Sequence, residues 1–324
     1  MKKATKLISL VSALLIGQML VGVAFAVQDS PTMGSIEQDL TEYLEANHPE
    51  LEPRSPEYVS YLVDVLMEDA DPGLAALPNY DDIQYFAGEY LYQLDLWQAS
   101  GSATDDATFT LPKSYKAKTI DTVQKEVYAQ QTQEDQLYAE ATDSIIKTPD
   151  ASINYNQDNS TAYALKYATS YNSNYATHSK DCTNFVSQCL HAGGFAMKKP
   201  SSPAIGITNT TKYWYSIKYQ EWHTNSYVNR WKETSSWIGV ADFYKYCVSK
   251  GAKIITCNTL KSLQNTAKVG DIVQLKKSGG SWYHSIIISS GTKGNLNYCG
   301  HTSNRKNYPV SKITGSVQYR IIRF

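Results

Sequence analysis

Residues 181–194 read DCTNFVSQCLHAGG, and this stretch decides how the second half of the chain is interpreted. Apolar side chains recur within it at helical spacing: Phe185, Val186, Cys189 and Leu190. The paired glycines at 193–194 end the pattern, because glycine adopts the backbone geometry of a helix C-terminus without strain. The stretch therefore predicts a helix that begins near Asp181 or Cys182 and stops before the glycines.

Cys182 is placed in the first turn of this helix. Unpaired backbone N–H groups and the helix dipole stabilise a thiolate there, as a nucleophilic cysteine requires. Its backbone N–H also suits a developing oxyanion. The alternative is a small buried residue, as we expect for Cys189 on the apolar face. Asp181 is expected to cap the helix or to act as a charged neighbour.

Strand patterns begin at residue 271. Four runs have strand patterns and are divided by Gly-rich breaks: DIVQLKK, HSIIISS, NLNYCGHT and SVQYRIIRF. A helical pattern over 161–171 and the helix at 182–192 precede them. Helices followed by a mainly antiparallel sheet indicate an α+β domain.

Two histidines lie downstream in this strand region. His284 opens an apolar run at a strand start, and His301 lies at the end of the following strand. A cysteine at a helix start followed by strand-borne histidines is typical of a nucleophile, a base and an orienting residue. Two-residue alternation puts Asn297 and His301 on one face, so either is a candidate for the third position. The competing interpretation of each histidine is a satisfied structural residue.

Charge is distributed unevenly, although the 324 residues carry a net charge of only −1. Residues 27–150 contain 25 acidic and 6 basic side chains, whereas residues 151–324 contain 6 acidic and 21 basic ones. Composition excludes a collagen, a coiled-coil rod, a polytopic membrane protein and a wholly disordered chain.

The acidic region of residues 27–150 is predicted to be mostly helical. Periodicity places helices around 36–44, 58–66, 81–98 and 118–141. We expect its carboxylates to face solvent. A sharper hypothesis is that the region docks on the basic half as a pro-segment, an inhibitor or a partner-binding arm.

The N-terminus has the features of a secretory signal peptide over residues 1–26. Lysines near the start precede an apolar run, and Ala24-Phe25-Ala26 fits the cleavage pattern. An uncleaved anchor is the alternative. We expect a secreted or cell-wall-associated protein with no transmembrane segment after cleavage.

All five cysteines lie in the basic half. An odd number leaves at least one thiol unpaired within the chain, and no pair has the spacing of a structural zinc site. We expect one reactive thiol plus structural or paired cysteines.

The string around Cys182 resembles the putative amidase domain family of secreted bacterial proteins. The resemblance rests on DCTNFVSQ, on the tyrosines before it, and on SW, VGDIV, HS and HTSNR in the same order at 236–237, 269–273, 284–285 and 301–305. It covers roughly 155–315. Such domains are similar to the papain-like CHAP and NlpC-type hydrolases. The resemblance implies a papain-like fold over residues 151–324, Cys182 as nucleophile, His284 as base, and a polar residue on the next strand. For that residue His301, within HTSNR, is favoured over Asn297.

Together these observations predict a secreted cysteine amidase or peptidase whose leading substrate is peptidoglycan. Net positive charge draws the domain to anionic polymers, and several tryptophans are expected to pack in the core or to line a sugar-stacking cleft. A thioester on Cys182 with His284 as general base needs no metal or organic cofactor. Export and the lack of a recognition motif argue against a specific nucleic-acid partner. The alternatives are an inactive cell-surface binding module, a Cys–His acyltransferase and a specialised secreted peptidase.

Overall fold

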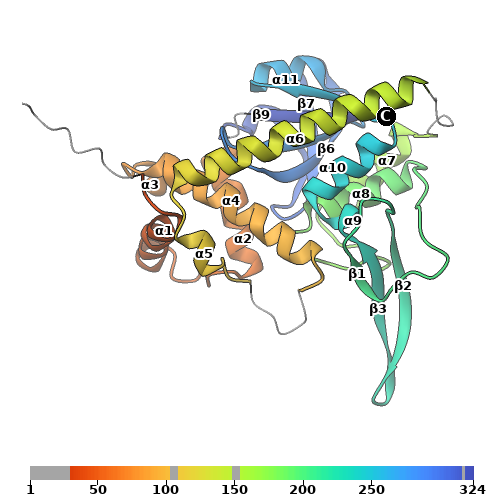
Figure 1. The fold of residues 1–324 in the computed structure, drawn as a ribbon, viewed down its shortest axis with the longest axis horizontal. Coiled ribbons are helices and arrows are strands. Elements are labelled where there is room, and N and C mark those ends of the chain that lie inside the picture. Colours follow the sequence, from red (N-terminus) through yellow and green to blue (C-terminus); the bar gives the residue numbers. More distant parts are fainter. Residues whose placement is uncertain (1–29, 103–108, 148–153, 316–317) are drawn as a thin grey trace, which may run out of the picture. The chain divides into compact units, whose positions relative to one another are not determined.

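A six-stranded antiparallel sheet organises the part of the chain that carries Cys182 (Figure 1). The structure is a computed structural model that describes residues 30–102, 109–147, 154–315 and 318–324. The predicted signal peptide at 1–26 lies outside the described residues. The strand order is β4-β9-β5-β6-β7-β8, and each neighbouring pair is antiparallel. The strands are β4 (Lys253–Cys257), β5 (Ile272–Lys276), β6 (Trp282–Thr292), β7 (Asn295–Gly300), β8 (Arg305–Pro309) and β9 (Gln318–Arg323). The predicted α+β class with a mainly antiparallel sheet is confirmed.

The sequence patterns located the four inner strands, β9, β5, β6 and β7, but missed β4 and β8. These two strands form the edges of the sheet. An edge strand is partly solvated, so its apolar alternation is weak. The residues of β8 are exposed or half-buried, and several are polar. The sequence pattern therefore did not predict this strand.

Alternating residues of the sheet enter two separate cores. On one face, Ile272 and Ile287 pack into a cluster with the helices that follow residue 154. On the other face, Val273 and Ile286 join a cluster built largely from the acidic region. The helices of the first face are α7 (Gln157–Tyr167), α8 (Cys182–Ala192), α9 (Ser235–Ile238) and α10 (Val240–Ser249). The principal helices of the second are α1 (Met33–Asn47), α2 (Pro56–Glu68) and α4 (Tyr80–Ala99). The sheet is thus buried on both sides.

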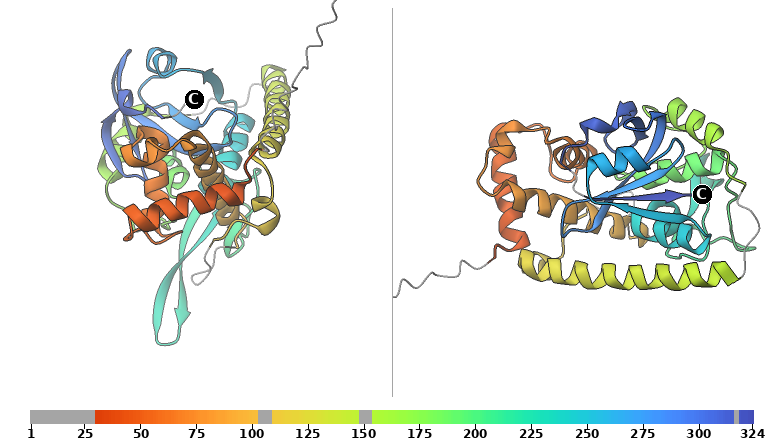
Figure 2. Two further views of the ribbon diagram at one scale, coloured as in Figure 1. Left: turned by 90° about the vertical axis from the view of Figure 1, so that its left-hand side faces the viewer. Right: turned by 90° about the horizontal axis from the view of Figure 1, so that it is seen from above.

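The long helix α6 (Ile120–Lys147) runs beside α10, as the view from above shows (Figure 2). The four helices predicted in the acidic region are confirmed as α1, α2, α4 and α6. The helix predicted at 161–171 is α7, which ends at Tyr167. The remaining elements are short: α3 (Pro72–Ala75), α5 (Lys113–Lys116), α11 (Leu260–Thr266) and the 3-10 turn η1 (Val310–Lys312).

A hairpin projects from the body of the domain and was not predicted (Figure 1). It consists of β2 (Ser216–His223) and β3 (Ser226–Thr234), with the short strand β1 (Gly206–Thr208) parallel to β3. Its two-residue turn is Thr224-Asn225, and Thr224 has a φ of 54°. Such turns usually contain Asn-Gly or Asp-Gly. Because Thr224 is unusual at this turn position, the sequence did not predict a hairpin.

Several carboxylates of the acidic region are buried against the basic half. The expectation that they face solvent is wrong for Glu89, Asp95 and Glu134. Glu89 accepts a hydrogen bond from the Ser281 backbone N–H at 2.7 Å, and Glu134 pairs with Arg320 at 3.3 Å. Residues Pro31–Phe324 form one compact unit, so these contacts belong to a shared interior.

All five cysteines of the chain lie within the described residues, and each is a buried free thiol. Disulfide pairing, one of the two alternatives expected for the other cysteines, is therefore wrong. Across the described ranges, no helix is both long enough and apolar enough to span a bilayer.

Removing the acidic region should leave the sheet without one of its two cores. A protein of residues 151–324 would expose the buried residues Val273, Leu275, Ile286, Ile288 and Ile321. Exposing each of these side chains lowers the free energy of unfolding by about 1.5–3 kcal/mol. The total free energy of unfolding of a domain is only about 5–15 kcal/mol. We expect residues 27–324 to unfold cooperatively by circular dichroism and residues 151–324 to show no cooperative transition. A sharp transition in the shorter protein would contradict this packing.

Candidate active site

Helix α8 carries Cys182 as its first residue. The backbone carbonyl of Asp181 accepts the Phe185 N–H at 2.9 Å, but the Asp181 side chain makes no capping bond to the helix. The capping role expected for this carboxylate is wrong, because neighbouring side chains and the preceding loop engage it instead. The Asp181 carboxylate therefore leaves the N–H groups of the first turn uncapped.

Helix α8 packs against β6 next to the two candidate catalytic residues. The hydroxyls of Thr183 and Ser285 lie 3.1 Å apart, and the Ser285 backbone N–H acts to lower the pKa of the Cys182 thiol. Ser285 directly follows His284 in β6. The structure thus brings the segments that carry Cys182 and His284 together.

Both groups are held in their neutral forms. Cys182 has no exposed surface, and burial raises the pKa of its thiol. The Lys180 ammonium, the Ser285 N–H and Thr183 oppose that rise, whereas the Asp95 carboxylate adds to it. Burial also lowers the pKa of His284 to about 3, and the charge of Lys180 adds to the effect. The resting pair is a thiol and a neutral imidazole.

Cys189 provides a comparison within the same helix. Burial raises the pKa of Cys189 well above its usual value, and the charge of Cys299 raises it further. It packs in the apolar cluster behind α8, as expected from its spacing. Cys182 differs because the Lys180 cation favours its thiolate, whereas no cation among the described residues acts on Cys189.

The His284 ring is enclosed, and one of its nitrogens is unused. Nδ1 is buried without a hydrogen-bond partner. On the other side, a Cβ added to Gly300 would lie 3.8 Å from Nε2 and 3.2 Å from the Ile286 side chain. Gly300 on β7 therefore leaves room for the Ile286 side chain beside the imidazole. The buried Nδ1 without a partner is available for proton transfer.

His301 is buried close to the start of α8 and is bonded through both ring nitrogens. Nδ1 lies 2.6 Å from an Asp181 carboxylate oxygen, and Nε2 lies 2.8 Å from the Tyr167 carbonyl. The ring also stacks on Phe185, with centroids 4.1 Å apart. Because both partners are acceptors, these bonds fix His301 and the start of α8 relative to each other. Its orienting role toward His284 stays a prediction.

Asn297, the other candidate for the third position, hydrogen-bonds the Ser290 hydroxyl at 3.1 Å. It pairs with Ser290 across the β6–β7 ladder. Ser290 is six residues from His284, which is roughly 20 Å along a strand. The structure therefore does not bring Asn297 to His284.

The loop before Cys182 is held by α4 of the acidic region. The Lys180 ammonium, fully buried, lies 2.6 Å from an Asp95 carboxylate oxygen. The other Asp95 oxygen accepts the Val240 N–H at 2.8 Å. Gln98 accepts the Lys180 N–H at 3.0 Å and donates to the Lys180 carbonyl at 3.2 Å. The sequence did not predict a role for Asp95 or Gln98, because a polar residue on an amphipathic helix does not indicate which distant residue it contacts.

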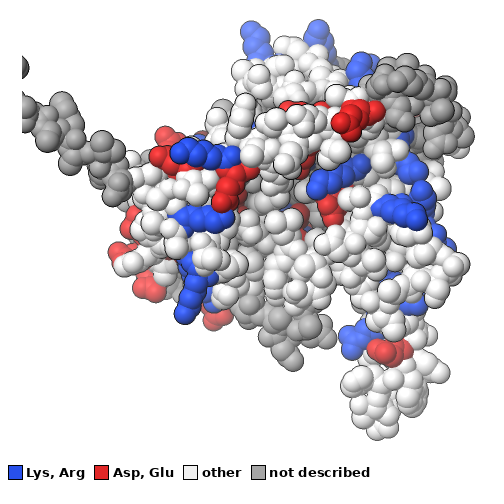
Figure 3. All heavy atoms as spheres, in the orientation of Figure 1, with Lys and Arg blue, Asp and Glu red and all other residues white. Residues whose placement is uncertain are grey.

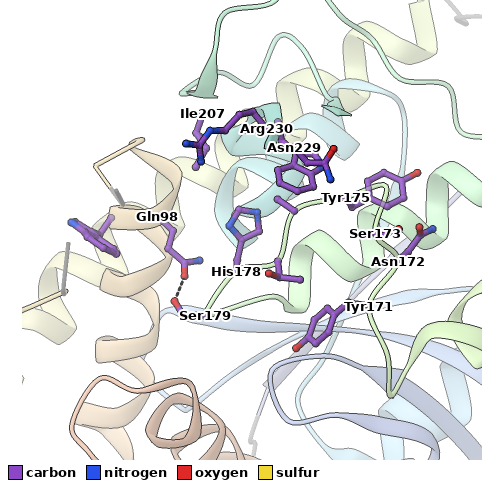
Figure 4. Close-up of a pocket in the computed structure, with 14 residues that line it drawn as sticks. Gln98, Tyr171, Asn172, Ser173, Tyr175, His178, Ser179, Ile207, Asn229 and Arg230 are labelled. Atoms are coloured by element: carbon purple, nitrogen blue, oxygen red, sulfur yellow. Dashed lines mark hydrogen bonds between the residues drawn. The ribbon is translucent and has the colours of Figure 1, made fainter. Parts of the chain in front are cut away.

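A cavity of about 760 Å³ opens beside this loop (Figure 4). It is lined by the end of α4, by residues 171–179 and by β3 of the hairpin. Its walls include Trp97, Tyr171, Tyr175, Arg230 and Trp231. Neither Cys182 nor His284 reaches its surface. Among the described residues, no set of three or more His, Cys, Asp or Glu side chains is arranged to hold a metal ion.

Comparison with known proteins identifies the family of this chain. The model of the family described as "Putative amidase domain" matches residues 154–322, about half of the chain. The chain belongs to this family. The family description points to amide-bond hydrolysis in general, and its boundaries include Cys182, His284 and His301.

Two Bacillus subtilis proteins are similar to the chain. The uncharacterized protein YjcM is 28% identical over 162 residues, which cover 47% of this chain and 32% of YjcM. The uncharacterized protein YhbB is 31% identical over 143 residues, covering 44% of this chain and 39% of YhbB. The chain thus spans 32% to 39% of the length of the curated relatives it matches. No solved structure matches it.

Breaking the Lys180–Asp95 pair should destabilise the protein strongly. Asp95→Asn leaves a buried ammonium without its counter-charge, which costs about 3–5 kcal/mol. The double variant Asp95→Leu with Lys180→Met removes both charges and should recover most of that loss. Urea unfolding at pH 7 measures both effects. Equal losses in the single and double variants would show that charge pairing is not the cause.

His284 should make stability depend on pH. Its pKa is 6.5 unfolded and about 3 folded, so the unfolded chain binds this proton first as the pH falls. The contribution to stability is fully present above pH 6.5 and declines toward pH 3, by at most about 1.4 kcal/mol per pH unit. Urea unfolding from pH 7 to 4 should give a steeper loss for the wild type than for His284→Gln. If the free energy of unfolding fell equally with pH in both proteins, His284 would not be a neutral, buried residue.

Proposed function

We propose that this protein is a secreted cysteine amidase or peptidase that cleaves amide bonds in peptidoglycan. The observation that carries the proposal is a cysteine at an uncapped helix start, packed against the strand segment of His284. Family membership supports amide hydrolysis. The sequence of residues 1–26 supports export, and the basic half supports attraction to an anionic wall polymer.

The inferred fold is papain-like, in the manner of CHAP and NlpC-type hydrolases. A helix-borne cysteine packs on an antiparallel sheet, and the adjacent strand carries histidine. In the proposed reaction, His284 takes the proton of Cys182 and the thiolate attacks the amide carbonyl carbon. N–H groups at the start of α8 stabilise the oxyanion. His284 then protonates the leaving amine, and water hydrolyses the thioester to release the acid.

Substrate access requires a change in the segments that cover the thiol. Residues 178–179 line the cavity, and Cys182 follows three residues later. A shift of the loop at 178–181 would join the cavity to the sulfur. Opening would also bring water to the site and relieve the burial that keeps Cys182 and His284 neutral.

Within this site, we propose that His301 acts as a positioning residue. Its bonds to Asp181 and Tyr167 hold the start of α8. Through Asp181 it also acts on the preceding loop, because the same carboxylate accepts the His178 N–H at 3.0 Å.

An inactive cell-surface binding module is the second candidate, and the complete burial of Cys182 is the observation that favours it. An acyltransferase would use the same thioester but pass the acyl group to an amine. Product analysis separates these functions, because hydrolysis releases a free acid and transfer forms a new amide.

The test is release of new amino groups and acids from purified peptidoglycan, identified by mass spectrometry. Cys182→Ala should abolish release, and His284→Ala should reduce it by about 10²–10⁴-fold, as expected when a general base is lost. Cys189→Ala is the matched control, a buried cysteine of the same helix, and should retain activity. Full activity in Cys182→Ala would overturn the mechanism. Wall binding without any release would favour the binding module.

A further inference from the structure

One face of the β2–β3 hairpin carries an unusual row of side chains. The register pairs Trp222 with Tyr227, Gln220 with Asn229, and Lys218 with Trp231. Residues directly opposite each other, and those two apart, share one face of an antiparallel ribbon. An aromatic pair, an amide pair and a third aromatic residue therefore follow one another from the tip toward the base. We call these six residues the hairpin face.

The outer aromatic pair does not contribute to a core. Trp222 is 61% exposed and Tyr227 is 65% exposed, and their rings meet edge to face with centroids 5.0 Å apart. By contrast, Trp214 and Trp237 are completely buried in the domain. Two adjoining exposed aromatic side chains on a projecting hairpin mark a binding surface rather than a packing requirement.

The inner end of the hairpin face continues into the cavity beside the active-site loop. Asn229 and Trp231 line the cavity, and Figure 4 shows Asn229 at its wall. The Trp231 indole donates to the Asn174 carbonyl at 3.1 Å, and the Lys218 ammonium donates to the Ser173 carbonyl at 2.7 Å. The base of the hairpin is therefore fixed to the segment that leads to Cys182. The face spans four residues of strand, about 13 Å, which suits a chain-like ligand.

We propose that the hairpin face binds the glycan strand of peptidoglycan, a chain of N-acetylated amino sugars, and directs it into the cavity. Aromatic rings stack on the apolar faces of sugar rings, which offer flat C–H surfaces. The amides of Gln220 and Asn229 can donate to and accept from hydroxyl and N-acetyl groups. This inference rests on the proposed function, because it names the substrate part that the site recognises.

The same features disfavour a membrane surface as the partner. The turn beyond the aromatic pair is polar, with His223, Thr224, Asn225 and Ser226 all exposed. Inserting the tip into hydrocarbon would desolvate these groups and then the amide pair, at a cost of several kcal/mol. In Figure 3 the end of the hairpin is largely uncharged, so it lacks the dense basic cluster that binds anionic lipid.

Binding is measured separately from cleavage by placing all variants in the Cys182→Ala background. The probes are insoluble peptidoglycan in co-sedimentation, a soluble N-acetylglucosamine tetramer, and phosphatidylglycerol vesicles. Trp222→Ala with Tyr227→Ala should weaken peptidoglycan binding at least about tenfold. Tyr128→Ala removes an aromatic side chain of α6 that is even more exposed, at 75%, and should have no effect. The tetramer should quench tryptophan fluorescence, and vesicles should not sediment the protein.

The inference is overturned if the double variant binds peptidoglycan within twofold of its parent, or if vesicles bind the hairpin instead. Its failure can be told apart from that of the proposed function. Aromatic-dependent binding, combined with no amine release by the protein that retains Cys182, would support the hairpin face and refute the hydrolase. Amine release by the protein that retains Cys182, combined with undiminished peptidoglycan binding in the double variant, would do the reverse.

Discussion

The buried ion pair between Lys180 and Asp95 is the constraint on which the site depends. Both side chains are almost completely buried, with Nζ and Oδ1 2.6 Å apart, and neither charge is tolerated there without the other. The pair joins the segment immediately before Cys182 to α4 of the acidic region. Asp95 lies outside the residues matched by the family model, 154–322. Part of the charge difference between the two halves of the chain is therefore neutralised inside the protein, directly before Cys182.

Burial and reactivity oppose each other at this site. A helix start favours a thiolate, but the complete burial of Cys182 raises its pKa, and His284 is kept neutral for the same reason. Lys180 sits where its charge acts on both residues, favouring the thiolate while disfavouring the imidazolium. We propose that the described arrangement is a resting form, which gains reactivity when the loop beside the cavity admits substrate and water.

Sequence patterns anticipated the elements whose signal is local. The helix at 182–192, the inner strands and the four acidic-region helices all follow from periodicity, and family motifs selected Cys182, His284 and His301. Sequence patterns did not predict ion pairs between residues distant in sequence, nor strands that are partly solvated. The Asp95–Lys180 and Glu134–Arg320 pairs span 85 and 186 residues, so neither member predicts the other. The edge strands β4 and β8 lack alternation, and the Thr224-Asn225 turn lacks the usual hairpin residues. Of the two roles expected for Asp181, the helix cap is wrong, and its carboxylate lies beside His301 as a charged neighbour.

The most direct test of the account is the labelling rate of each cysteine in the native protein by iodoacetamide, mapped by peptide mass between pH 5 and 9. All five thiols are buried, so accessibility alone gives no reason for one to stand out. If Cys182 and His284 act as a pair, Cys182 reacts well before Cys189, with a pH dependence that disappears in His284→Ala. Equal rates for Cys182 and Cys189, or an unchanged profile in His284→Ala, would contradict a Cys182–His284 pair.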